Sequence, residues 1–208
     1  MRIERIFENN EKWIADKLKL NKEYFHELSQ GQTPEILYIG CSDSRVTAEE
    51  LMGAAPGEVF VHRNISNMVS NLDLSSASVI NYAVEQLKVK HVVICGHYYC
   101  GGVKAAMGSQ NLGILNPWLR NIRDVYRFNM EELDAIEDEE ARYKRLVELN
   151  VEQQCLNTLK KAEVQIGYKE WGLRVHGWVF DIHSGKIIDL KVKDKEILEK
   201  IKRVYHIE

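Results

Sequence analysis

Two continuous apolar runs, each followed by side chains that bind metals, constrain the fold of this chain most. The run 36–40 is followed by Cys41, and the run 92–95 is followed by His97 and Cys100. Such runs are typical of strands that are buried on both faces of a parallel sheet. Because sites in these folds lie beyond the carboxyl ends of the strands, we expect the two segments to converge on one site.

Strand-like segments alternate with helical periodicity along the rest of the chain. We expect strands at 35–40, 58–63, 91–95, 173–182 and 186–192, the last two forming a hairpin. Helical patterns occupy 2–28, 47–52, 74–87, 102–107, 115–128, 130–165 and 192–205. This order predicts an α/β fold. Its central sheet is mostly parallel, with about four parallel strands plus an antiparallel edge strand, flanked by helices and with projecting N-terminal helices.

Length and composition indicate a single domain over residues 1–208. The formal charge of -3, with no basic cluster, argues against nucleic acid as a partner. We expect no membrane association, because no apolar stretch is long enough to span a bilayer and the N-terminus lacks a signal core. Four cysteines are too few for a disulfide scaffold, so we expect a cytoplasmic protein in which Cys95 and Cys155 are buried, unreactive thiols.

The residues after the two apolar runs offer a zinc ligand set. Cys41, His97 and Cys100 supply two thiolates and an imidazole, which zinc prefers. Three protein ligands, with the fourth position left for water, indicate a catalytic rather than a structural site. Asp43 and Arg45 follow Cys41 closely, and a bidentate pair between them would keep the carboxylate ionised.

The same residues carry a family resemblance. Cys-Ser-Asp-Ser-Arg at 41–45 and His-Tyr-Tyr-Cys-Gly-Gly at 97–102 resemble the motifs of the β-class carbonic anhydrases. The likeness continues through 56–64, 82–84, 95–97 and 176–178, and spans residues 8 to 195.

This resemblance implies a carbonate dehydratase with one zinc per chain, held by Cys41, His97 and Cys100. It implies the reversible hydration of carbon dioxide to bicarbonate and a proton, a lyase reaction of carbon utilization. Zinc-bound hydroxide would attack carbon dioxide, oriented by the Asp43–Arg45 dyad. In a closed state, Asp43 itself would become the fourth zinc ligand.

The resemblance also implies a homodimer, commonly paired into tetramers as a dimer of dimers. The N-terminal helical arm, residues 1–30, and the central sheet would form the dimer. The substrate cleft would lie at the dimer interface. Its matching positions here are Gln32, Phe60, Ile65, Tyr82, Gly101 and Gly102.

The chain departs from the family at a second, regulatory bicarbonate pocket. Some members form this pocket from a Trp, an Arg and a Tyr, and bicarbonate there favours the closed state. The matching positions here are Tyr38, Arg63 and Phe180, and Phe180 has no hydroxyl to offer an anion. These departures put bicarbonate regulation in doubt, and we expect an open site, with Asp43 paired to Arg45.

Three other functions are compatible with the same residues. The fold could hydrolyse a related small molecule such as carbon disulfide. Asp43 could be a permanent fourth ligand in a non-catalytic zinc protein. Cys41 could act as a nucleophile, although its potential His and carboxylate partners are assigned to the metal. None of the remaining histidines stands out as a proton shuttle.

Overall fold

The computed structural model describes residues 2–205, and the chain divides into two compact units between Thr33 and Pro34. The first unit holds two helices, α1 (Glu4–Leu20) and α2 (Tyr24–Ser29). The predicted single helix over 2–28 was wrong at its centre. Asn21 is extended, and its side-chain oxygen accepts a hydrogen bond from the Glu23 amide at 2.9 Å, which competes with helical bonding.

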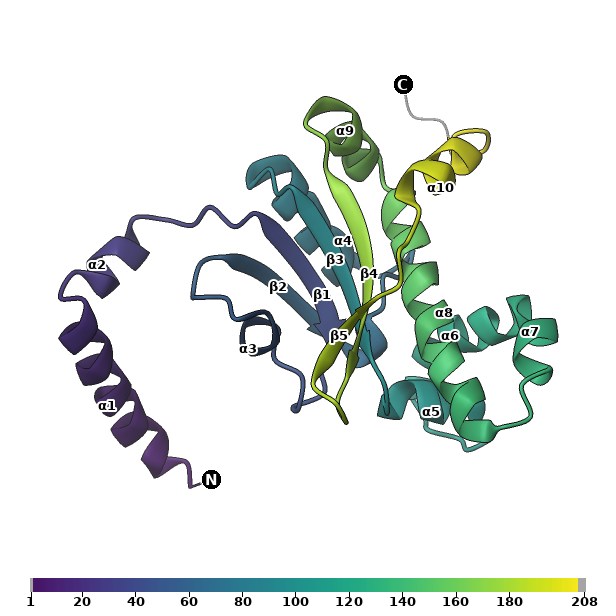
Figure 1. Cartoon of the computed structure of the whole chain (residues 1–208), viewed down its shortest axis with the longest axis horizontal. Helices are drawn as coiled ribbons and strands as arrows, with labels where there is room; N and C mark the ends of the chain where they lie inside the picture. Colours follow the sequence, from purple (N-terminus) through teal and green to yellow (C-terminus); the bar gives the residue numbers. More distant parts are fainter. Residues whose placement is uncertain (1, 206–208) are drawn as a thin grey trace. The chain divides into compact units, whose positions relative to one another are not determined.

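A five-stranded sheet organises the second unit, in the order β2-β1-β3-β4-β5. The strands are β1 (Ile36–Cys41), β2 (Val59–Asn64), β3 (His91–His97), β4 (Arg174–Asp181) and β5 (Lys186–Asp189). The first four are parallel, and β5 pairs antiparallel with β4 at one edge (Figure 1). The predicted fold class is confirmed.

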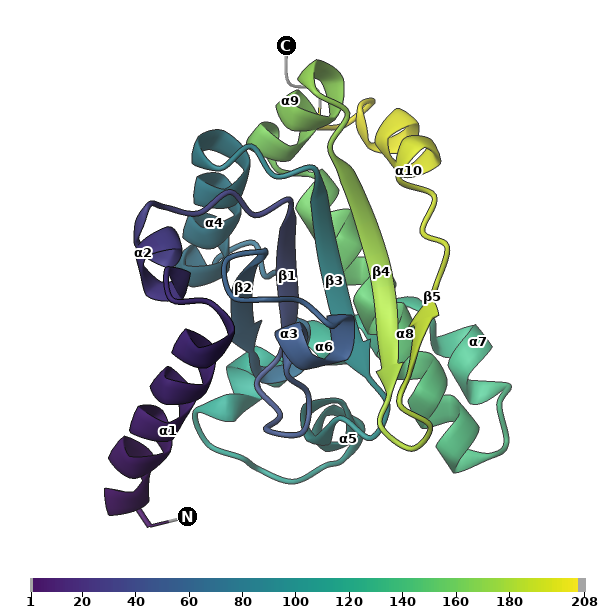
Figure 2. The same cartoon turned by 60° about the vertical axis from the view of Figure 1, so that its left-hand side comes forward.

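Helices cover both faces of this sheet. They are α3 (Ala48–Met52), α4 (Leu74–Asn81), α5 (Gly101–Met107), α6 (Leu115–Phe128), α7 (Met130–Asp134), α8 (Glu139–Leu159), α9 (Ala162–Glu170) and α10 (Asp194–Ile201). The short 3₁₀ turn η1 (Ile65–Asn67) follows β2, and the π-type segment η2 (Tyr82–Gln86) continues α4. Figure 2 shows α3 in front of the sheet and α8 behind it, where α8 packs on β3 and β4.

The apolar side chains of the strands divide between the two faces. On the α8 side, Leu37 and Ile94 are fully buried in the larger core cluster. On the α3 side, Tyr38 and Val93 belong to a smaller cluster. Each fully buried aliphatic side chain stabilises the fold by about 1.5–3 kcal/mol, so both runs are fixed in place up to their carboxyl ends.

The predicted helix over 130–165 was wrong, because three helices share this region. Asp138 interrupts it: its backbone is extended and its side chain accepts a hydrogen bond from the Ala141 amide at 2.7 Å, so it caps α8. Lys161 is also extended, and separates α8 from α9. No helix within residues 2–205 is long and apolar enough to cross a membrane.

Candidate metal centre

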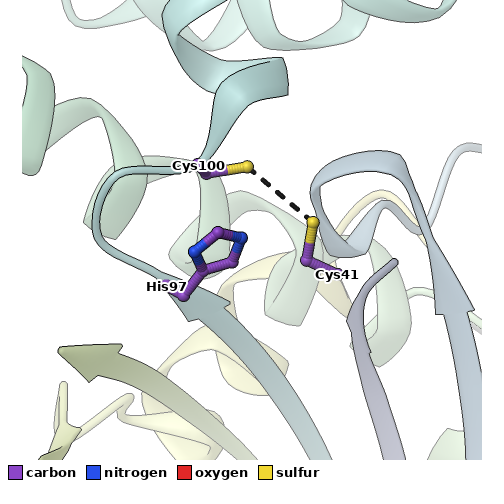
Figure 3. A group of neighbouring side chains, drawn as sticks. All are labelled: Cys41, His97 and Cys100. Atoms are coloured by element: carbon purple, nitrogen blue, oxygen red, sulfur yellow. Dashed lines mark hydrogen bonds between the residues drawn. The ribbon is translucent and has the colours of Figure 1, made fainter. Parts of the chain in front are cut away.

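The two predicted ligand segments meet at the carboxyl edge of neighbouring strands. Cys41 is the last residue of β1, and His97 is the last residue of β3, its parallel neighbour (Figure 3). Tyr99 then adopts a left-handed backbone conformation, with φ 61°, and turns the chain so that Cys100 directly precedes α5, as its N-cap residue. Strand pairing and one turn therefore bring all three side chains together.

The three donor atoms are close together and sheltered from solvent. The sulfur atoms of Cys41 and Cys100 lie 3.9 Å apart. One nitrogen of His97 lies with both sulfurs in a group whose members are all within 4.8 Å of one another. The exposed fractions of Cys41, His97 and Cys100 are 5%, 0% and 1%.

A hydrogen bond decides which nitrogen of His97 faces the sulfurs. Nδ1 lies 3.0 Å from the carbonyl oxygen of Tyr98, which can only accept, so Nδ1 carries the proton. In this tautomer of the neutral ring Nε2 is the nitrogen with a free lone pair, and it is buried without a hydrogen-bond partner in the described chain. Metal-ligating histidines are commonly oriented by this kind of bond to the opposite nitrogen.

The hydrogen bond between the two thiols shifts their pKa values in opposite directions. Hydrogen bonding to Cys41, with further donation from Ser66 and the amides of Val103 and Gly102, lowers the pKa of Cys100 to about 6. The bond to Cys100, together with burial, raises the pKa of Cys41 to about 12. The opposite directions follow from one contact, because the proton that Cys41 keeps is the one that stabilises the Cys100 thiolate.

Asp43 and Arg45 form a bidentate pair beside the ligands. Arg45 donates from Nε to Oδ1 at 2.9 Å and from Nη2 to Oδ2 at 2.7 Å, and its amide also donates to Oδ1 at 3.0 Å. These bonds hold the pKa of Asp43 well below its usual range. Oδ2 lies 3.8 Å from Nε2 of His97, so the carboxylate borders the donor cluster without leaving Arg45.

Two side chains that sequence reasoning did not assign to the ligands hold the ligand backbone. Arg63 donates to the carbonyl oxygens of Cys41 at 2.9 Å and of Asp43 at 2.5 Å. The hydroxyl of Tyr143 donates to the carbonyl of Cys100 at 2.6 Å. Tyr143 comes from α8, far away in sequence, so no local pattern could have pointed to it.

Three of the six predicted substrate residues lie next to Cys100. Gly101 and Gly102 follow it directly. Ile65 lies against Gly102: if that glycine had a Cβ atom, the atom would lie 2.8 Å from Cγ2 of Ile65. The Ile65 side chain is 41% exposed. An open pocket of about 450 Å³ lies beyond Gly101 and is lined by Tyr99, Lys104, Glu139, Glu140 and Tyr143.

Of the other three predicted substrate residues, two lie in the second unit but away from the ligands, and the third belongs to the first unit. Phe60 pairs in register with Leu37, four residues before Cys41, which places it about 13 Å back from the edge at about 3.3 Å per residue. Tyr82 stacks on Phe60, with ring centroids 5.7 Å apart, and is 47% exposed. Gln32 is exposed and belongs to the first unit.

The donor set fits zinc. Two thiolates bound at about 2.3 Å to one tetrahedral zinc would lie about 3.8 Å apart, close to the observed 3.9 Å. The buried, unpartnered Nε2 supplies a third donor, and metal coordination would satisfy it. Fold and site together define a class of protein: an α/β protein with a zinc-type centre at the carboxyl edge of its parallel strands.

Comparison with known proteins identifies the family. The family model described as carbonic anhydrase matches residues 36–187. A carbonic anhydrase of Emericella nidulans is 58% identical over 205 residues, which cover 98% of this chain and 90% of the relative.

Solved structures agree. The β-carbonic anhydrase CafA of Aspergillus fumigatus superposes with a TM-score of 0.93 at 40% identity, covering 99% of both chains. A tetrameric β-carbonic anhydrase of Sordaria macrospora gives 0.87 at 43% identity, covering 90% of this chain and 96% of that one. The chain belongs to the β-class carbonic anhydrases. The predicted family and the predicted enzyme class, a carbonate dehydratase, are confirmed.

Proposed function

We propose that this protein hydrates carbon dioxide reversibly, with one zinc ion held by Cys41, His97 and Cys100. The observation that carries the proposal is the orientation of His97, whose protonated Nδ1 is tied to Tyr98 while the buried Nε2 faces two thiols. When bound, zinc lowers the pKa of a water molecule and supplies hydroxide near neutral pH. The chain's own residues then have to orient the reactants and handle the proton.

Asp43 is the orienting group in this proposal. Its carboxylate is ionised and accepts hydrogen bonds, so it can accept one from the attacking hydroxyl and direct a lone pair of that oxygen toward carbon dioxide. Arg45 fixes the carboxylate by two side-chain bonds and one amide bond, which removes its freedom to rotate. A group held in this way is already positioned before the substrate arrives.

The same pairing favours an open site over a closed one. Both oxygens of Asp43 are committed to Arg45, at 2.9 Å and 2.7 Å, and Arg45 also reaches the carbonyl of Tyr99 at 3.4 Å. A closed site would have to break these charge-assisted bonds before Asp43 could bind zinc. We infer that Asp43 is not a fourth ligand, which also disfavours a purely structural zinc protein.

The substrate cleft is proposed to be shared between two copies of the chain. Gly101, Gly102 and Ile65 border the ligands of their own chain, but Phe60 lies about 13 Å back along the sheet, and Tyr82 packs against it. An apolar wall of Phe60 and Tyr82 would suit an uncharged, linear gas. In a two-fold dimer these residues can complete the partner's site, because each surface meets its equivalent on the other chain.

We propose that residues 1–30 form the dimerisation arm and that dimers pair further. Exposed apolar side chains on α1 or directly before it, such as Phe7 at 74% and Ile3 at 67%, are suited to a protein contact. The relative from Sordaria macrospora is described as tetrameric, which supports a dimer of dimers. The four cysteines are reduced and buried, which is compatible with a cytoplasmic protein.

We also propose that bicarbonate does not regulate this enzyme. The Tyr38 ring is 1% exposed and lies over Gly40, where a side-chain carbon would come within 2.3 Å of it. Arg63 is engaged with two backbone carbonyls. Phe180, opposite His97 in the sheet, offers no hydroxyl. This proposal is supported by the buried Tyr38 ring, the engaged Arg63 and the lack of a hydroxyl on Phe180.

Metal removal and return tests the main proposal. A chelator should abolish carbon dioxide hydration, measured by stopped flow. Zinc should restore it in proportion to the metal bound, up to one ion per chain. Protein that carries one zinc per chain at the Cys41, His97 and Cys100 cluster and yet does not hydrate carbon dioxide would overturn the proposal.

A further inference from the structure

A buried loop with unusual backbone geometry lies against Cys100. Ser66 and Asn67, at the end of η1, have φ of 64° and 50°, although neither is a glycine. Their exposed fractions are 0% and 2%. The hydroxyl oxygen of Ser66 lies 3.4 Å from the sulfur of Cys100. Left-handed conformations at such residues persist only where the surroundings enforce them, and they concentrate at functional sites.

A polar stripe on α8 enforces this loop conformation. Asn150 donates from Nδ2 to the carbonyl of Ser66 at 3.1 Å. Gln154, one turn further along, donates to Oδ1 of Asn150 at 3.0 Å and accepts from the amide of Val69 at 2.9 Å. Asn150 and Gln154 are each 1% exposed, so these bonds form without competition from solvent.

The loop also packs tightly against the turn that follows Cys100. A side-chain carbon at Gly102 would lie 2.2 Å from the hydroxyl oxygen of Ser66, so only a glycine fits there. Ser66 is therefore confined between α8 on one side and the Cys100 turn on the other. Its hydroxyl has little freedom to move away from the sulfur.

Metal binding fixes the direction of the Ser66–Cys100 hydrogen bond. A cysteine that ligates zinc is a thiolate and has no proton to donate. The serine hydroxyl must then be the donor. We propose that Ser66 is a positioning residue that donates to the Cys100 thiolate and aims its sulfur at the metal, and that Asn150 sets the place of this hydroxyl. The inference rests on the proposed function, because it takes Cys100 to be a zinc ligand.

Cobalt in place of zinc gives a direct readout of this bond. Cobalt(II) bound to thiolates absorbs in the near ultraviolet by charge transfer from sulfur to metal. A hydrogen bond lowers the energy of the sulfur lone pairs, so its loss should move the bands to longer wavelength. We expect this shift in both Ser66→Ala and Ser66→Gly, with one cobalt per chain. Glycine keeps the left-handed backbone without strain, and so separates loss of the hydroxyl from loss of the loop geometry.

Two further variants complete the spectral test. Asn150→Ala should shift the bands in the same direction, although Asn150 touches no ligand. Ser76→Ala is the matched control: Ser76 is also fully buried, on α4, but its hydroxyl bonds to the carbonyl of Asp73, and we expect no shift. As a second readout, zinc should pass to a chelator about 10- to 100-fold faster from both Ser66 variants than from the wild type.

The outcomes separate this inference from the proposed function. If wild-type protein with one cobalt per chain lacks thiolate bands, the metal centre itself is wrong. If the bands are present but stay in place in both Ser66 variants, the donor role of Ser66 is overturned. A shift in Ser66→Ala but none in Ser66→Gly would also overturn it, because loop geometry alone would then explain the effect.

Discussion

Backbone carbonyls, more than side chains, hold the residues of the metal centre. The carbonyl of Tyr98 fixes His97, Arg63 holds the carbonyl of Cys41, and Tyr143 holds that of Cys100. Arg63 belongs to β2 and Tyr143 to α8, and the amide of Tyr98 donates to the carbonyl of Phe180 on β4. Because these anchors lie in or on packed elements, the donors are held in place before a metal arrives. Preorganised donors lose little freedom on binding, which favours a firmly held ion.

Asp43 should be dispensable for metal binding and necessary for turnover. Asp43→Ala leaves Cys41, His97 and Cys100 unchanged, so we expect one zinc per chain. Loss of the orienting carboxylate should lower kcat about 100-fold or more. Metal analysis and stopped-flow hydration would be compared with Asp124→Ala, which removes an exposed carboxylate on α6 that pairs with Arg127. Activity of the Asp43 variant within about threefold of wild type would refute the orienting role.

The ligands and the dyad could be predicted from sequence, because short motifs at strand ends encode them. Ser66 and Tyr143 could not. Ser66 acts through a left-handed backbone conformation that serine seldom adopts, and no local sequence pattern predicts that conformation. Tyr143 reaches the site from α8, 43 residues after Cys100. Contacts of this kind depend on the packing of whole elements.

The packing of α8 on the sheet depends on close approach at β4. A side-chain carbon at Gly177 would lie 2.7 Å from Cγ2 of Val192, 3.1 Å from Cγ1 of Val151 and 3.2 Å from the sulfur of Cys155. Gly177 lies opposite Ile94 in the neighbouring strand, in the middle of the sheet. A glycine at this position lets α8 pack close to β4 and to its neighbour β3, which ends at His97.

Gly177→Ala should therefore destabilise the fold. We expect overpacking to lower the free energy of unfolding by about 1–3 kcal/mol, measured by denaturant titration. Gly108→Ala is the control, because a side-chain carbon there meets only the Ala105 carbonyl at an ordinary 3.6 Å. Equal stability of the two variants would show that α8 does not pack on Gly177 as described.

At the element scale, strands were more predictable than helix boundaries. The apolar runs predicted the bounds of β1 and β3 to within two residues, since both faces of these strands are buried. The region 130–165 has no Gly or Pro at either break, and the caps at Asp138 and Lys161 resemble ordinary polar helix residues. The polar stripe of Asn150 and Gln154 likewise has the spacing of a solvated helix face, yet it is buried against the site.

In the proposed dimer, each complete site requires residues from both chains. Asp43→Ala chains and Tyr82→Ala chains should each be at least about tenfold less active alone. A mixed dimer has one site in which an intact metal centre meets an intact Tyr82 from the other chain. Random mixing makes half of the dimers mixed, so co-expression should recover about a quarter of wild-type activity. No recovery above the separate variants would place Tyr82 and Asp43 in the same chain's site.

The pH dependence of turnover tests the central claim most directly. Two thiolates offset the double positive charge of zinc, whereas three neutral imidazoles would not. We therefore expect a water molecule at this centre to have a higher pKa than at a site with three histidines. Asp43 contributes no step in this range, because Arg45 keeps its pKa well below the usual value and it stays ionised throughout.

The measurement is stopped-flow carbon dioxide hydration from about pH 6.5 to about pH 9, on protein with one zinc per chain. The active form is the deprotonated one, so the account predicts fast turnover that climbs steadily with pH across this range. A flat profile would contradict the assignment of two thiolate ligands. Absence of turnover at every pH, with zinc fully bound, would contradict the catalytic site itself.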